Sequence, residues 1–233
     1  MIRIPDDWPP SSLMHALDRD DQLALAALGT ARVFQDKEIL MLEGAAGDEV
    51  FLVLDGFVKV TAYRDGGGAD TVLAIRPRGE LVGEFAVLDR RPRSATVTAC
   101  GSVVAVRIGR DRFLEFLRVR PETALEITRS VVRKLRSATS RRIDERTRGA
   151  SAKLARVLHE LAVDYGQEHP EGVRIELTLT QVELGALAGV ADSTAEAVLS
   201  RWRRRGVIST GYRRVVVRDL PALASLGDHG DNP

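Results

Sequence analysis

Between residues 33 and 109 the sequence alternates short apolar runs with glycine-containing turns. Of all the features of the sequence, this pattern constrains the fold most. The runs are rich in valine, isoleucine, leucine and phenylalanine, and they span Glu49–Leu54, Phe57–Tyr63, Thr71–Ile75 and Ser102–Ile108. Short strands separated by glycine turns at regular spacing are typical of an all-β roll or sandwich. We predict such a roll, with hairpin turns at Asp55-Gly56 and between Asp65 and Gly68.

Helical spacing replaces this pattern on both sides of the predicted roll. The leucines within residues 13–30 include pairs four and three positions apart, Leu13–Leu17 and Leu25–Leu28, and predict one short helix. Residues 110–118 predict another short helix, which Pro121 stops, and a long helix follows over residues 122–148. The sequence therefore predicts an α+β protein with a roll domain at residues 13–121 and a long connecting helix.

A second, smaller domain follows the long helix. The helical pattern pauses from Gly149 to Ser151, which predicts a hinge before a helix over residues 153–165. Residues 166–172 are polar and predict a loop. We place this second domain at residues 149–220.

Two adjacent lines of residues run along the long helix: the first is a heptad seam only in its middle, and the second is apolar. One line, spaced alternately four and three residues apart, holds Ala124, Thr128, Val131, Leu135, Ala138 and Arg142; the other holds Leu125, Ile127 and Val132. A helix that only packs on its own roll needs a single apolar line. Two lines can serve the roll and a second copy at once, so we predict a parallel homodimer through residues 124–143.

Residues 83–95 combine groups that suit different parts of one ligand. Gly83 allows a backbone to approach an anion closely, while Arg93 and Ser94 supply donors that suit phosphate oxygens. Glu84 as a carboxylate only accepts hydrogen bonds, so it suits a sugar hydroxyl and repels phosphate. Together they predict a pocket for a phosphorylated ribose. The alternative is a surface turn in which Glu84 pairs with one of three arginines, Arg90, Arg91 or Arg93.

Residues 178–208 carry the pattern of a helix-turn-helix. Thr180 and Glu183 form a capping box at the start of the first helix, and Gly189 supplies the turn. Asp192 or Ser193 caps the second helix. The alternative is a structural helix pair with no role in nucleic-acid binding.

Basic charge is concentrated just beyond this pattern, although the net charge of the whole chain is only +1. Residues 201–218 contain seven arginines and no carboxylate, and residues 207–217 predict a hairpin wing. A basic segment of one sign is typical of a surface that contacts phosphate backbones, whereas a solvated face normally mixes both signs. The second domain is therefore predicted to bind DNA.

From about residue 13 to about residue 218, these motifs in this order make the chain resemble the CRP/FNR family of bacterial transcription regulators. The resemblance implies a β-roll (jelly-roll) domain that binds a cyclic nucleotide, a dimerisation helix and a winged helix-turn-helix. In that arrangement Arg93 and Ser94 hold the cyclic phosphate, and Glu84 binds the ribose 2′-hydroxyl. Gly83 allows the backbone to approach the ligand closely. The implied ligand site also includes Val82, Phe85, Ala95 and Lys134.

The resemblance leaves the nucleobase contact open. Counting from Arg93 places Ala138-Thr139 on the long helix beside the base, and a shift of one residue places Thr139-Ser140 there instead. Such a shift rotates a side chain by about 100° around the helix. A serine after the arginine is the pattern that the family associates with cyclic AMP, so cyclic AMP is the first expectation and cyclic GMP the second. No resident cofactor is expected.

The second helix departs from the family's usual recognition sequence, Ser-Arg-Glu-Thr with a later arginine. The corresponding residues are Ala191, Asp192, Ser193 and Thr194, with Ala197 in place of that arginine. Direct base readout must therefore differ. The DNA-contacting set comprises Thr180, Gln181, Asp192, Ser193, Thr194 and Glu196, with Arg201, Arg203, Arg204, Arg213 and Arg214 as phosphate contacts.

The remaining residues argue against other classes of protein. The chain has one cysteine, Cys100, and no histidine between residues 31 and 148, which disfavours an iron–sulfur or haem sensor. No catalytic or zinc-ligand pattern accompanies Glu84, so an enzyme is not expected. No membrane segment or leader is evident, which suggests a cytoplasmic regulator. Its expected partners are double-stranded DNA, cyclic nucleotide, a second copy and RNA polymerase; the alternative is a nucleotide sensor whose second domain binds a protein.

Overall fold

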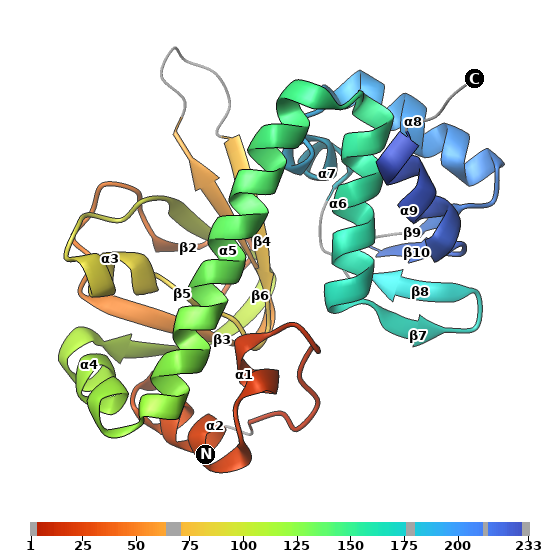
Figure 1. Cartoon of the computed structure of the whole chain (residues 1–233). Coiled ribbons are helices and arrows are strands. Elements are labelled where there is room, and N and C mark those ends of the chain that lie inside the picture. The colour runs from red at the N-terminus through yellow and green to blue at the C-terminus, as the bar shows by residue number, and fades with distance from the viewer. Residues whose placement is uncertain (1–3, 64–70, 176–179, 212–213, 230–233) are drawn as a thin grey trace. The chain divides into compact units, whose positions relative to one another are not determined.

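The computed structural model of the chain describes residues 4–63, 71–175, 180–211 and 214–229 (Figure 1). It divides into two compact units, residues 1–135 and 136–233, and each is considered separately below. The division falls within the long helix α5 (Pro121–Thr147), so each unit includes part of that helix.

The first unit is built around an antiparallel β-roll, as the sequence predicts. Its strands are β1 (Thr30–Phe34), β2 (Ile39–Met41), β3 (Glu49–Ala62), β4 (Thr71–Pro77), β5 (Leu81–Val82) and β6 (Thr96–Gly109). The main path runs β1-β6-β3-β4, while β2 pairs with β6 and β5 with β3. Pairing of the two 14-residue strands β3 and β6 supplies the centre of the roll. Their inward side chains, such as Leu52 and Val106, are almost fully buried.

The predicted hairpin turn at Asp55-Gly56 is wrong. Strand β3 continues through both residues, and its pairing with β6 shifts register on each side of Asp55. Gly56 has a φ of 81°, and a Cβ there would lie 2.5 Å from the carbonyl oxygen of Ser102. The dipeptide therefore forms a β-bulge, because pairing with β6 on both sides outweighs its local tendency to turn. The second predicted turn, between Asp65 and Gly68, lies outside the described residues.

Helices cover the start and end of the roll. Two short helices, α1 (Leu13–Ala16) and α2 (Arg19–Ala27), replace the single helix predicted over residues 13–30. Leu17 is extended, and the Asp18 side chain caps α2 by accepting a hydrogen bond from the Asp21 N–H. The other helices are α3 (Glu84–Asp89) and α4 (Arg110–Val119), and α5 begins at the Pro121 that ends α4.

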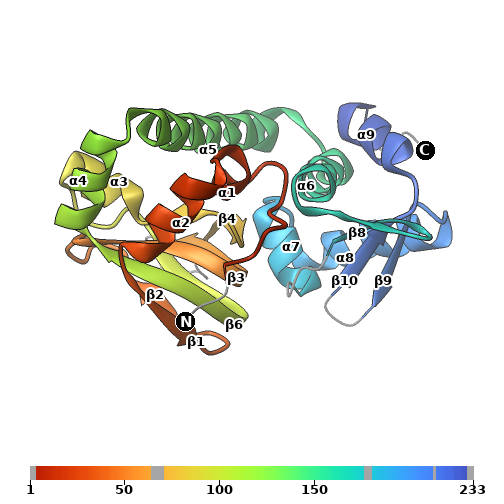
Figure 2. The same cartoon turned by 90° about the horizontal axis from the view of Figure 1, so that it is seen from below.

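The second unit combines helices with a small sheet (Figure 2). Its helices are α6 (Ala150–Tyr165), α7 (Gln181–Leu187), α8 (Asp192–Arg204) and α9 (Leu220–His229). Its strands are β7 (Gln167–His169), β8 (Gly172–Ile175), β9 (Ile208–Gly211) and β10 (Arg214–Val217), in the order β7-β8-β10-β9.

Two parts of this unit differ from the sequence prediction. The polar stretch 166–172, predicted as a loop, contains strand β7 and the turn into β8. Edge strands have one face of backbone groups free, so polar residues are tolerated there. Helix α9 was not predicted, and it packs along α6.

The predicted helix-turn-helix is present between Thr180 and Arg204. Thr180 Oγ1 accepts from the Glu183 N–H at 3.1 Å while the Glu183 carboxylate accepts from the Thr180 N–H, which confirms the capping box. Gly189 has a φ of 62°, as a steep turn between helices requires. The predicted caps of α8 are wrong: its N-cap is Ala191, without a side-chain bond, and Asp192 and Ser193 lie in its exposed first turn.

Candidate functional sites

Gly83 forms the bend that leads into α3. It is the N-cap of that helix and has a φ of 86°, a left-handed conformation that favours glycine. A Cβ at this position would lie 2.6 Å from Arg93 Nη1, 2.9 Å from Met41 Cε and 3.1 Å from the Glu49 carbonyl oxygen. The close approach of Arg93 to this bend therefore requires glycine for steric reasons as well.

Arg93 is a buried cation held chiefly by backbone groups. It is 6% exposed, and its Nη1 donates to the Gly83 carbonyl oxygen at 2.9 Å. Its own N–H donates to Ala45 O and its carbonyl oxygen accepts from Gly44 N, both at 2.9 Å. Burial lowers the pKa of the guanidinium, while negative charge on nearby carboxylates opposes that shift.

Of the three nearby carboxylates, those of Glu49, Asp48 and Glu84, two are engaged by other cations. Glu49 forms an ion pair with Arg107, and Glu84 with Lys134. Within the described parts of the chain, no carboxylate forms an ion pair with Arg93, so the alternative of a Glu84–Arg93 surface pair is not observed. A buried charge is normally compensated by a partner of opposite sign. The position therefore suits an anionic ligand.

Glu84 belongs to a second buried charge cluster, in which Lys134 lies between two carboxylates. Glu84 is 3% exposed, and its Oε1 accepts from Lys134 Nζ at 2.7 Å. The same ammonium donates to the Leu81 carbonyl oxygen at 2.6 Å and lies 3.5 Å from Glu80 Oε2. Oε2 of Glu84 remains available to accept a hydroxyl, which leaves the predicted sugar contact chemically possible.

Glu80 is a residue of this cluster that the sequence analysis missed. It is 5% exposed, and its Oε1 also accepts from the Leu13 N–H at 3.3 Å. The only local signal is a carboxylate directly before the apolar pair Leu81-Val82. Its role follows from Lys134, which lies 54 positions later and reaches it only through folding.

The other predicted ligand-site residues differ in their exposure. Val82 and Ala95 are buried, whereas Ser94 is exposed and its hydroxyl can reach solvent or a ligand. Phe85 is 40% exposed, which is high for a large apolar side chain. Ala138, Thr139 and Ser140 lie on α5 within the second unit, and their contact with a nucleobase remains a prediction.

Helix α8 presents the predicted base-contacting residues on one exposed side. Asp192, Ser193, Thr194 and Glu196 are exposed, as are Thr180 and Gln181 at the start of α7. The opposite side of α8 is buried through Ala195, Val198, Leu199 and Trp202. Gly185 of α7 approaches this buried side so closely that a Cβ would lie 2.9 Å from the Ala195 Cβ.

The arginines of the basic segment fall into two groups. Arg201, Arg204 and Arg214 are exposed and able to contact phosphates. Arg203 is half-buried, and its Nη1 donates to Thr210 Oγ1 at 3.1 Å, which ties α8 to strand β9. Arg213 lies outside the described residues. Arg205, at the C-cap of α8, is a further exposed arginine that the predicted set omitted.

Two further features of the described residues bear on other functions. No group of three or more His, Cys, Asp or Glu side chains in these parts of the chain is arranged to hold a metal ion. Among the described helices, none combines the length and apolar character needed to cross a membrane.

Comparison with known proteins gives two family matches. Residues 31–120 match the cyclic nucleotide-binding domain, and residues 152–226 match the Crp-like helix-turn-helix domain. The first match contains Gly83, Glu84 and Arg93, and the second contains α7, α8 and the wing.

Individual proteins resemble the chain over most of its length. A CRP-like cAMP-activated global transcriptional regulator of Mycobacterium tuberculosis is 28% identical over 78% of this chain and 81% of its own length. The cyclic AMP receptor protein of Thermus thermophilus is 27% identical over 93% of this chain and 96% of its own length. A solved structure of a CooA mutant from Carboxydothermus hydrogenoformans aligns with a TM-score of 0.73 at 21% identity, covering 97% of this chain and 98% of that one. At that identity the structure supports the fold alone.

Proposed function

Because the chain belongs to the CRP/FNR family of transcription regulators, and carries that family's cyclic-nucleotide-binding and DNA-binding domains, we propose that it is a homodimer controlled by cyclic AMP. Nucleotide bound in the first unit changes the arrangement of the α5 helices, and this sets the spacing of the two α8 helices on DNA. A coupling of about 1–3 kcal/mol between the sites is sufficient for a clear switch.

The observation that carries this proposal is the state of Arg93. The residue is 6% exposed, and its guanidinium is not ion-paired with any described carboxylate and lies against the left-handed bend at Gly83. A cyclic phosphodiester carries one negative charge and two free oxygens, which match the planar fork of an arginine. Binding of that group supplies the charge compensation that the buried guanidinium otherwise lacks.

The carboxylate cluster favours a ligand with a ribose hydroxyl beside the phosphate. Lys134 engages Oε1 of Glu84, and Oε2 is the oxygen proposed to accept from a 2′-hydroxyl. Serine at position 94 and the two relatives named for cyclic AMP favour adenine over guanine. Cyclic GMP is the second candidate, and Ala138, Thr139 and Ser140 are the residues proposed to meet the base.

Exposed apolar side chains on α5 support the proposed dimer. Leu125, Val132 and Leu135 are 43%, 40% and 64% exposed, whereas Ile127 is 2% exposed and packs in the roll core. Together with the exposed Thr128, the three exposed residues Leu125, Val132 and Leu135 are spaced three, four and three positions apart. This spacing is typical of the contact seam of a two-stranded coiled coil. In the predicted line, Ala124 and Val131 are half-buried, so the seam includes Leu125 and Val132 in their place.

Substitution in this seam tests the dimer. Leu135→Glu places a charge at the contact, so sedimentation equilibrium is expected to give a monomer at concentrations where the wild type is a dimer. Val119→Glu is the control, since Val119 is 66% exposed on α4, away from the seam. A wild-type chain that stays monomeric at all concentrations would remove the dimer from the proposal.

The second unit is proposed to read DNA differently from the usual family pattern. Ser193, Thr194 and Glu196 are the candidates to meet base edges, and Arg201, Arg204 and Arg214 to meet phosphates. RNA polymerase is the protein partner proposed for the DNA-bound dimer.

Ligand identity is tested by thermal shift and calorimetry with a panel of cyclic mononucleotides and dinucleotides. A ligand that binds only the folded state raises the melting temperature, so cyclic AMP is expected to give the largest shift. Electrophoretic mobility with a random duplex pool, with and without cyclic AMP, then tests the switch. If no member of the panel shifts the melting temperature while DNA still binds, the sensor function is rejected and DNA binding stands.

A further inference from the structure

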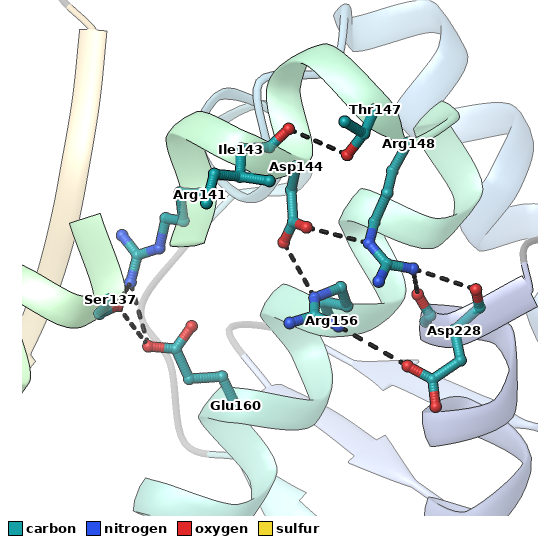
Figure 3. Close-up of polar contacts among 10 residues, drawn as sticks. Ser137, Arg141, Ile143, Asp144, Thr147, Arg148, Arg156, Glu160 and Asp228 are labelled. Atoms are coloured by element: carbon teal, nitrogen blue, oxygen red, sulfur yellow. Dashed lines mark hydrogen bonds and ion pairs between the residues drawn. The ribbon is translucent and has the colours of Figure 1, made fainter. Parts of the chain in front are cut away.

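The end of α5 carries polar side chains on one line of the helix. Ser137, Arg141, Asp144 and Arg148 follow one another at spacings of four, three and four, so the first three lie on one stripe of α5 and Arg148 just past its end. Each of the four side chains makes polar contacts with another of the four or with a different helix of the second unit (Figure 3).

Asp144 bridges the break between α5 and α6. Its Oδ1 accepts from Arg148 Nε at 2.9 Å, and its Oδ2 accepts from Arg156 Nε on α6, also at 2.9 Å. The Asp144 side chain is 15% exposed, so solvent screens these pairs less than ordinary surface pairs. One carboxylate therefore ties both sides of the break at Arg148-Gly149.

Arg148 extends the tie to the C-terminal helix. Its Nη1 donates to the carbonyl oxygens of Gly227 at 2.7 Å and Asp228 at 3.0 Å, near the end of α9. A cation there satisfies unpaired carbonyls and complements the negative end of the helix. Arg156 also lies 3.6 Å from the Asp228 carboxylate, and α9 is so close that a Cβ on Gly227 would lie 2.9 Å from Arg156 Cγ.

A second tie lies one helical turn further along α6. Glu160 Oε1 accepts from Ser137 Oγ at 2.9 Å and from Arg141 Nη2 at 3.2 Å, while Arg141 Nη2 also donates to Ser137 Oγ at 2.9 Å. The segment of α5 from Ser137 to Asp144 is thus attached to α6 at both ends. Helix α6 in turn packs against α7, α8 and α9.

These contacts argue against a hinge at the Gly149 break. Rotation there would separate Asp144 from Arg156 and Arg148 from α9, with the loss of several charge-assisted hydrogen bonds. Among the described residues, Lys134 of α5 makes side-chain hydrogen bonds to the roll, and three positions later Ser137 makes one to α6. The division between the two compact units falls between these two positions.

We propose that Asp144, Arg148 and Arg156 are positioning residues: they make the last third of α5 a rigid part of the DNA-binding unit, so that α5 bends near Leu135-Arg136 and not at Gly149. Movement of α5 that follows ligand binding is then passed to α8 through α6 and α9. Only this transmission step rests on the proposed function; the rigid attachment of α5 does not.

Hydrogen exchange of the full-length protein, followed by mass spectrometry, tests the attachment. In Asp144→Asn the amides of residues 137–147 are expected to exchange roughly tenfold faster, the size expected from the loss of one or two charge-assisted bonds, while residues 124–134 are unchanged. Glu171→Gln is the matched control, because it removes the Arg218–Glu171 ion pair elsewhere in the same unit. Unchanged exchange in Asp144→Asn, or an equal effect of Glu171→Gln, overturns the proposal.

A second variant tests the same attachment without removal of a charge. Gly227→Ala brings a methyl group against Arg156 Cγ and is expected to speed exchange of residues 137–147 in the same direction. In addition, Asp144→Asn combined with Arg156→Gln should have an effect smaller than the sum of the two single effects, because both remove the Asp144–Arg156 pair while Arg156→Gln also removes the contact with Asp228. Fully additive effects would mean that the two residues act separately, against the proposal.

Transmission is measured as the ratio of DNA affinities with and without cyclic AMP, on a duplex that the wild type selects from a random pool. In Asp144→Asn this ratio is expected to fall about fivefold, while cyclic AMP affinity in the absence of DNA stays at the wild-type value. An unchanged ratio rejects the transmission step. If cyclic AMP does not raise the DNA affinity of the wild type, the proposed function fails. The rigid attachment of α5 to the second unit is then tested by hydrogen exchange alone.

Discussion

The two units hold their functional charges in opposite ways. In the nucleotide-binding unit, Glu84 and Arg93 are 3% and 6% exposed, and the Lys134 side chain is 10% exposed. In the DNA-binding unit, Arg201, Arg204 and Arg214 lie on the surface. Buried charges fix a small ligand in one geometry at a cost in folding energy, whereas exposed charges attract a long polyanion with little cost and little sequence preference.

The largest expected effect in this comparison is on stability. Lys134→Met leaves the carboxylates of Glu80 and Glu84 buried without a cation, which should lower the free energy of unfolding by about 3 kcal/mol at neutral pH. Chemical denaturation measures the loss, and Arg118→Met, at a side chain 73% exposed, is the control with little effect. A loss no greater than that of the control would mean that the buried cluster is not compensated by Lys134.

Arg93→Ala tests the buried cation against its ligand. Removal of the guanidinium deletes the charge-assisted hydrogen bonds proposed to the phosphate, so cyclic AMP affinity should fall at least roughly 100-fold, to undetectable levels in practice. Calorimetry measures the affinity, and circular dichroism checks that the roll remains folded. Glu84→Ala is expected to weaken binding by a smaller factor; near-native affinity of Arg93→Ala would refute the phosphate assignment.

A smaller effect is expected for the exposed arginines. Arg204→Ala combined with Arg214→Ala should weaken binding to all DNA sequences about equally, by roughly tenfold, and reduce the slope of log affinity against log salt by about two. Competition binding on several duplexes at two salt concentrations measures both. A change in sequence preference would show instead that these arginines read bases.

The smallest expected effect concerns a half-buried ion pair within the first unit. Burial opposes ionisation of Asp21, but hydrogen bonds from Thr123 and Arg120 outweigh it and lower the pKa of this carboxyl. A lowered pKa contributes stability above the unfolded-state value of about 3.9, and this is lost as the pH falls through the folded-state value. Asp21→Asn should therefore cost about 1 kcal/mol at pH 7.

Denaturation curves at several pH values check this last effect. The stability difference between the wild type and Asp21→Asn should shrink as the pH falls below about 4 and close only below the lowered folded-state pKa, where the wild-type carboxyl is protonated as well. Asp7→Asn is the control, since the Asp7 side chain is 82% exposed and its pair with Arg78 contributes little. A gap that persists in acid would mean that Asp21 acts by packing and not by charge.

Local signals in the sequence were sufficient for much of the fold. The Thr180–Glu183 capping box and Gly189 depend on residues only a few positions apart, and the structure reproduces them. The same holds for α4 and α5, whose shared boundary is set by Pro121. The Asp55-Gly56 bulge was missed because the pairing that overrides the local turn tendency comes from β6, more than forty residues away.

For the sites, the sequence alone determined which chemical groups are present: a glycine bend, a carboxylate and an arginine–serine pair in one segment, and a basic wing after a helix-turn-helix. Only the tertiary structure decided their pairing. It brings Lys134 to Glu84 and Glu80, leaves Arg93 with backbone acceptors, and joins Asp144 to Arg156 across a break in the helix. The reason is physical: short-range preferences fix helices, strands and turns, whereas the partner of a buried charge depends on which distant segments folding places beside it.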